Sequence, residues 1–132
     1  MKIIIATATT TAIALALATP AFAAPITTPA EAIAAFDATR TDATQRANFC
    51  RMGKADAESL AAYKSGDKPT MLRTTKEAND LRKKLARYQE AFTYAGKRSV
   101  KAENWGTPET IAINKAQDAL RDSCTAAAVT TP

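Results

Sequence analysis

Apolar residues recur every three or four positions in three stretches of the chain, which is the spacing of one face of an α-helix. The clearest stretch predicts one long helix over residues 69–95. Its apolar face consists of Met71, Thr74, Ala78, Leu81, Leu85, Tyr88, Phe92 and Ala95. The first stretch has Ile33, Phe36, Ala43, Ala47 and Cys50, and the last has Ile113, Ala116, Leu120, Cys124 and Ala127. No segment alternates with a period of two, so a sheet is not expected.

Helix boundaries are marked by capping residues. Thr28 with Glu31 forms a capping box that predicts the first helix start. Prolines at positions 29, 69 and 108 occupy first-turn sites, where the missing N–H costs nothing. Gly66 and Gly96 are predicted to end helices.

The first helix is expected over residues 28–65, either continuous with a kink or restarting after Gly53. With about 1.5 Å of rise per residue, an all-α fold, a small three-helix up-down-up bundle, places residues 50 and 124 at similar heights in neighbouring parallel helices, whereas a four-helix up-down bundle fits this pair less well. In that arrangement Cys50 and Cys124 approach each other on neighbouring apolar faces.

These two cysteines are the only ones in the chain. Redox dithiols usually lie close in sequence, whereas 73 residues separate this pair. A structural disulfide between Cys50 and Cys124 is therefore predicted. Free thiols or an intermolecular bridge are the alternatives.

The N-terminus has the pattern of a signal peptide over residues 1–23. Lys2 precedes an apolar run, and the run is followed by small residues at the positions that a signal peptidase reads. Cleavage is predicted between Ala23 and Ala24, leaving a single domain over 24–132 whose C-terminal tail frays. The protein is expected in the periplasm or outside the cell, without a transmembrane anchor.

Histidine is absent, which removes the commonest general base and the commonest metal ligand. The sequence has no nucleophile elbow, phosphate loop, calcium loop or haem attachment motif. We therefore expect no enzymatic activity, no cofactor and no metal site.

Positive charge is concentrated in the middle of the chain, where residues 64–101 contain eleven Lys and Arg against four Asp and Glu. This excess defines a candidate surface for an anionic partner. The surface comprises Arg73, Lys76, Arg82, Lys83, Lys84, Arg87, Lys97 and Arg98. The alternative is a solvated helix face, since Asp80 lies four residues from both Lys76 and Lys84. Nucleic acid is not expected, because no recognition motif accompanies these cations.

Two aromatic residues are candidate anchors for a partner. Trp105 lies in a predicted loop, and Tyr94 falls off the apolar face of residues 69–95. The alternative for Trp105 is that it folds back over the open end of the bundle.

Together these features predict an exported, non-enzymatic binding protein whose partner is another protein or an anionic component of the cell envelope. In size, export, helicity, basic charge and one long-range disulfide, the chain is similar to periplasmic acid-stress chaperones. That similarity implies a second hypothesis, in which thinly packed helices open in acid and expose apolar faces. A small enzyme of unknown reaction is the third.

Overall fold

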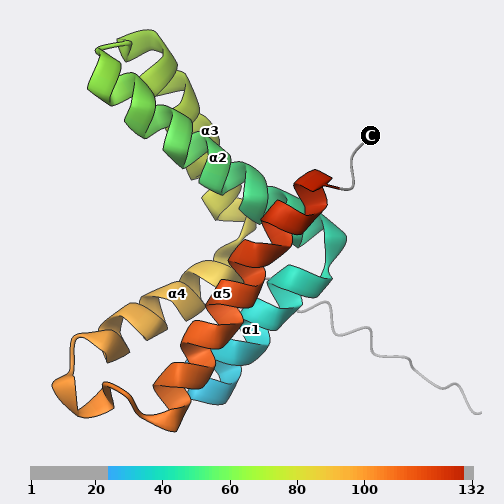
Figure 1. Ribbon diagram of the computed structural model, residues 1–132, viewed down its shortest axis with the longest axis vertical. Helices are drawn as coiled ribbons and strands as arrows, with labels where there is room; N and C mark the ends of the chain where they lie inside the picture. The colour runs from blue at the N-terminus through green and yellow to red at the C-terminus, as the bar shows by residue number, and fades with distance from the viewer. Residues whose placement is uncertain (1–23, 130–132) are drawn as a thin grey trace, which may run out of the picture.

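The computed structural model describes residues 24–129, with side chains over 24–125 (Figure 1). The predicted signal peptide, the side chain of Ala127 and the last three residues of the predicted tail lie outside these ranges. The helices are α1 (Pro29–Thr41), α2 (Ala43–Ser65), α3 (Lys68–Lys84), α4 (Ala86–Ser99), the 3-10 helix η2 (Ala102–Asn104) and α5 (Pro108–Val129). The predicted all-α class is confirmed.

Helices α1, α4 and α5 form the body of the protein, with α1 packed against both of the others (Figure 1). Phe36 lies at the centre of its core and is fully buried. The ring of Tyr88 meets Phe36 and Phe49 edge-on, with centroids 5.8 and 4.9 Å apart. Burial raises the pKa of the Tyr88 phenol above its ordinary value.

Helices α2 and α3 form an antiparallel hairpin that projects from the body as an arm (Figure 1). Beyond Met52 and Leu81, which belong to the main core, the buried residues of the arm are small. They are Ala55, Ala62, Thr74 and Ala78. Ser59 and Thr75 add a hydroxyl hydrogen bond of 2.6 Å between the helices. The arm is therefore a thin structure whose two helices pack mainly on each other.

The predicted disulfide between Cys50 and Cys124 is confirmed. It joins α2 to α5 at the base of the arm, and the two Cα atoms lie 5.4 Å apart. Both cysteines pack against the core and are half-buried. The bridge therefore ties the arm to the body close to its point of attachment.

The predicted helix starts near residues 28, 68 and 107 are confirmed. The Thr28 hydroxyl accepts a hydrogen bond from the Glu31 N–H at 3.2 Å, and the Thr107 hydroxyl accepts one from the Thr110 N–H at 3.3 Å. Gly66 ends α2 with φ of 75°, a left-handed conformation that glycine adopts without strain.

The prediction of three helices is wrong in number, because two of the expected helices are each divided. The first division falls at Asp42, whose carboxylate accepts a hydrogen bond of 2.8 Å from the Gln45 N–H and so caps α2. Gly53, where a kink or a restart of the helix was left open, lies inside α2. Gly96 does not end a helix either, since α4 continues to Ser99.

The second division falls at Leu85, between α3 and α4. Its backbone leaves the helical region, with φ of −113° and ψ of 36°, while its side chain stays 1% exposed. The chain turns here because α3 follows α2 into the arm, whereas α4 packs against α1 in the body. Leu85 thus lies in the core at the corner between the two.

This division changes which residues of α4 are buried. The apolar face of α4 is centred on Ala91, with Tyr88, Tyr94 and Ala95 packed around it. Phe92 was expected in the core, but it is 52% exposed and only stacks on Tyr88, at 6.0 Å between centroids. Tyr94 was expected on the surface, and it is half-buried.

Candidate functional site

The eight predicted cations do not form one surface, because the turn at Leu85 divides them. Five of them lie on α3 in the arm and three on α4 in the body. Those on α3 are Arg73, Lys76, Arg82, Lys83 and Lys84, and those on α4 are Arg87, Lys97 and Arg98.

Two of the three body cations are engaged in holding the fold. The Arg87 guanidinium donates to the Ala24 carbonyl oxygen at 2.6 Å and to Glu90 Oε2 at 2.7 Å. Arg98 Nε donates to the Thr110 hydroxyl at 3.2 Å. These side chains fasten the N-terminal segment and the start of α5, so they contribute less to a binding surface than the sequence suggested.

On α3, the cations and acids form both local pairs and pairs with α2. Arg82 Nη2 donates to both carboxylate oxygens of Asp56 at 2.6 Å. Lys76 Nζ lies 2.8 Å from Asp80 Oδ2. The hydrogen bond and the charge of Lys76 lower the pKa of Asp80 below its ordinary value. The side chain of Lys76 is nevertheless 78% exposed and remains accessible to a partner.

The division between arm and body is also a division of charge. Residues 43–84 contain ten Lys and Arg against five Asp and Glu, a net charge of +5. Residues 24–42 and 85–132 contain seven Lys and Arg against eight Asp and Glu, a net charge of −1. The whole positive excess of the predicted mature chain therefore lies on the arm.

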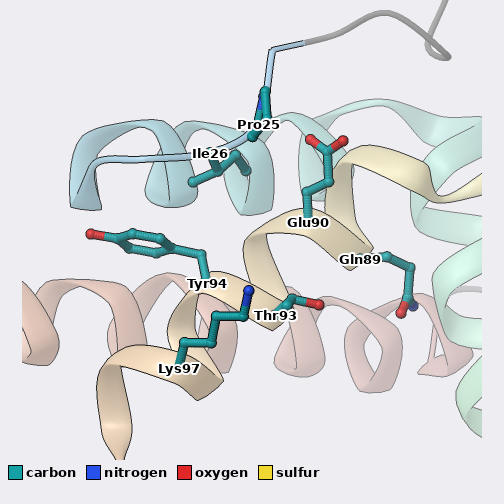
Figure 2. A pocket seen from close by; sticks show the side chains of 7 residues that line it. All are labelled: Pro25, Ile26, Gln89, Glu90, Thr93, Tyr94 and Lys97. Carbon is teal, nitrogen blue, oxygen red and sulfur yellow. The ribbon is translucent and has the colours of Figure 1, made fainter. Parts of the chain in front are cut away.

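A second candidate is a groove of about 300 Å³ in the body, between the N-terminal segment and α4. Figure 2 shows Pro25 and Ile26 on one side and five side chains of α4 on the other. Its lining includes a carboxylate, Glu90, and an ammonium group, Lys97. Ile26, which lines the groove, is 8% exposed and packs in the core. The groove is therefore mainly the seat of the N-terminal segment.

Trp105 does not cover the end of the body as the alternative interpretation required. Its ring is 67% exposed, although Nε1–H donates to the Ser99 carbonyl oxygen at 2.7 Å. Val100 and Ile111 are exposed at the same end, at 78% and 58%. This end of the body therefore exposes three large apolar side chains, and the indole N–H of one of them is hydrogen-bonded to the backbone.

Sequence reasoning missed the exposed apolar residues of the arm. Leu60, Tyr63 and Leu72 are 55%, 71% and 57% exposed, close to the turn between α2 and α3. The sequence contained a signal for their exposure. Leu60 directly follows Ser59 and Tyr63 directly follows Ala62, and Ser59 and Ala62 lie on the internal face of α2. A residue one position further along a helix is rotated by about 100°, which turns it away from that face. A hollow of about 240 Å³ lies beside Tyr63, between α2 and α3.

No protein-family model, curated protein or solved structure matches the chain. Among residues 24–129, no helix is long and apolar enough to cross a membrane. Within the same range, no three His, Cys, Asp or Glu side chains gather in a way that would hold a metal ion. The candidate site is therefore interpreted from its geometry and charge.

Proposed function

We propose that this protein is an exported, non-enzymatic binding protein that uses its arm to hold an anionic partner in the cell envelope. The observation that carries the proposal is the charge division, +5 on the arm and −1 on the rest of residues 24–132. A concentrated field of one sign attracts a partner of the other sign and orients its approach. The disulfide at the base of the arm supports this, because it restrains the binding element relative to the body.

Heparin serves as a defined polyanion to test the electrostatic part of this proposal. We expect the protein, taken as residues 24–132 with its disulfide formed, to bind heparin at low salt and to be released as salt screens the attraction. Lys83→Glu combined with Lys84→Glu, both exposed on α3, should shift elution to lower salt. Arg87 is unsuitable here, because it also holds Ala24.

The matched control is Lys101→Glu combined with Lys115→Glu, which makes the same change of charge on exposed positions of the body. It should elute much closer to the unmodified protein than the arm variant does. Equal shifts for the two variants, or binding that is indifferent to ionic strength, would contradict the proposal.

A second candidate function, that of an acid-stress chaperone, is favoured by the thin packing of the arm. Beyond the core its helices are joined by small side chains and by the carboxylate pairs Arg51–Glu77 and Arg82–Asp56. The arm also carries Asp67 and Asp80, whose hydrogen bonds lower the pKa of both carboxyls, so acid would remove a stabilising contribution from the arm and expose its internal face. The test is to follow the aggregation of a client protein in acid with and without this protein. If this protein does not reduce the aggregation, the chaperone function is rejected.

A further inference from the structure

The arm has two faces of different chemistry, each marked by an ion pair between α2 and α3. Asp56–Arg82 crosses one face and Arg51–Glu77 crosses the other. On each helix the two paired residues are five positions apart, about 140° around the axis. The two pairs therefore lie on opposite sides of the contact between the helices.

The face crossed by Asp56–Arg82 carries the exposed apolar residues of the arm, and we call it the apolar-basic face. Leu60 and Tyr63 follow Asp56 by four and seven residues, so they lie on its side of α2. Leu72 lies at the margin of this face, because it precedes Asn79 by seven residues and Asn79 accepts a hydrogen bond from Arg82. All three exposed large apolar side chains of the arm thus share one side.

Two lysines lie one helical turn from members of this apolar group. Lys64 follows Leu60 by four residues on α2, and Lys68 precedes Leu72 by four on α3. Lys68 also lines the hollow of about 240 Å³ with Tyr63 and Met71. The acid on this face, Asp56, is already bound by Arg82 through both of its oxygens.

The face crossed by Arg51–Glu77, the ion-paired face, has a different composition. It bears the acids Glu58 and Glu77 together with Lys54 and Arg73, which share its side of the helices by their spacing from Arg51 and Glu77. Lys54 Nζ lies 4.0 Å from Glu58 Oε1. Two acids accompany the three cations of this face, whereas the apolar-basic face has one acid, Asp56, beside Arg82, Lys64 and Lys68.

We propose that the apolar-basic face of the arm docks on the surface of an anionic lipid bilayer. Leucine, tyrosine and lysine side chains on one helical face are the combination that lies at the boundary of headgroups and acyl chains, where tyrosine and lysine keep their polar ends in the headgroup layer. The net charge of +5 on the arm supplies attraction to anionic headgroups.

A second copy of the chain is a poorer occupant of this face. Pairing two apolar-basic faces would bring unpaired lysines of both copies together, while the acid on each face is already bound. Like charges without compensation oppose such a contact. A lipid surface instead provides many anions and accepts the apolar side chains as well.

The inference rests on the proposed function and names its partner. The test uses residues 24–132 with vesicles of phosphatidylglycerol and phosphatidylcholine in equal parts, and with vesicles of phosphatidylcholine alone. We expect sedimentation with the anionic vesicles at low salt and little with the neutral ones. Leu60→Gln combined with Tyr63→Gln should weaken vesicle binding roughly tenfold or more, because the buried apolar area is lost. Heparin binding should stay unchanged, because no charge changes.

Matched controls address charge and position. Lys64→Glu with Lys68→Glu, on the apolar-basic face, should weaken vesicle binding more than Lys54→Glu with Arg73→Glu, which makes the same change of charge on the ion-paired face. Trp105→Gln removes an exposed aromatic residue of the body and should leave vesicle binding unchanged.

A direct readout places a reporter on the face itself. Tyr63→Trp in a Trp105→Phe background should show a blue shift of its fluorescence on anionic vesicles and quenching by brominated acyl chains. The inference is overturned if the Leu60 and Tyr63 variant binds vesicles as the unmodified protein does while heparin binding persists, or if Trp105→Gln abolishes vesicle binding. Dimerisation through this face without lipid would also overturn it. Loss of both heparin and vesicle binding in the unmodified protein would instead reject the proposed function.

Discussion

The body and the arm of this protein are held together by different kinds of contact. The body has a core of aromatic and aliphatic side chains, among them Phe36, Ile113 and Leu120, which are almost completely buried. The arm beyond Met52 and Leu81 has alanine, threonine and serine between its helices, with ion pairs along its two edges. Apolar burial stabilises the body, whereas the arm depends mainly on the close approach of its two helices, because partly exposed ion pairs contribute little.

Because their contacts differ, the body and the arm should be destabilised by different changes. A core of large side chains is sensitive to truncation and insensitive to pH, since it contains few ionisable groups. The arm should respond to acid, because its Asp67 and Asp80 carboxyls have a lowered pKa in the folded state and their protonation increases its net positive charge. The two regions should therefore separate experimentally when each is challenged in its own way.

The largest effect is expected from truncating the centre of the body. Phe36→Ala should reduce the free energy of unfolding by about 3–5 kcal/mol, measured by chemical denaturation with circular dichroism. Ile113→Val provides a milder change of about 0.5–1.5 kcal/mol should Phe36→Ala fail to fold. Leu60→Ala, on an exposed position of the arm, is the control and should change stability little. Similar losses for Phe36→Ala and Leu60→Ala would refute the contrast between core and arm.

Removing the disulfide should have the next largest effect. Cys50→Ser with Cys124→Ser is expected to cost about 2–4 kcal/mol, since the bridge closes a long loop in the unfolded chain. Chemical reduction of the unmodified protein should give the same loss of thermal stability. Hydrogen exchange should increase first where α2 meets α5. An unchanged melting temperature after reduction would show that the bridge does not restrain the arm.

Acid should open the arm before the body. The hydrogen bonds of Asp67 from Thr70 and of Asp80 from Lys76 lower the pKa of both carboxyls below 3.8. Their stabilising contribution is complete above that ordinary value and is lost as the pH falls through the lowered pKa of the folded state. Hydrogen exchange between pH 5 and about 2 should show α2 and α3 losing protection at a higher pH than α1, α4 and α5.

The control for the acid experiment is Asp67→Asn combined with Asp80→Asn, in which these two contributions no longer depend on pH. In this variant, the hydrogen-exchange protection of α2 and α3 should be lost over a narrower pH range than in the unmodified protein, because two titrating groups have been removed. Loss of protection in all helices at one pH, in both proteins, would mean that the arm and the body unfold as one unit.

The smallest effect is expected at Gly53, where the sequence left a kink or a restart of the helix open. Gly53 lies inside α2, and a Cβ atom added there meets nothing within 4 Å. Gly53→Ala should therefore stabilise the protein by about 0.5–1 kcal/mol. Gly66→Ala should have the opposite sign, because Gly66 has a positive φ. A destabilising Gly53→Ala would indicate that α2 needs flexibility at this point.

Much of the fold was predictable from local signals. Capping residues and prolines located three helix starts, and the two cysteines predicted the bridge between α2 and α5. The division at Asp42 also had a local signal, since Gln45 follows it at the spacing of a capping box. Gly53 was the only position considered for a division of the first helix, and a helix interior tolerates glycine at modest cost.

The division at Leu85 had no such signal. Leu85 continues the apolar spacing of residues 69–95 and is itself buried, so a straight helix and a bent one give the same pattern. The bend is visible only in the tertiary contacts, since α3 packs on α2 whereas α4 packs on α1. The prediction of one straight helix also led to the prediction of one cationic surface. The bend divides that surface, because it places Arg73 in the arm and Arg98 in the body.

The disulfide has a further consequence for how the protein responds to cleavage. Residues 63–69 at the end of the arm are all exposed and include Lys64, which makes this turn a favourable place for a trypsin-like protease to cut. Cys50 lies before that turn and Cys124 after it, so both fragments stay covalently joined. Such a nicked molecule would migrate as one species on a non-reducing gel and as two on a reducing gel, and proteolysis would open the end of the hairpin without releasing either half.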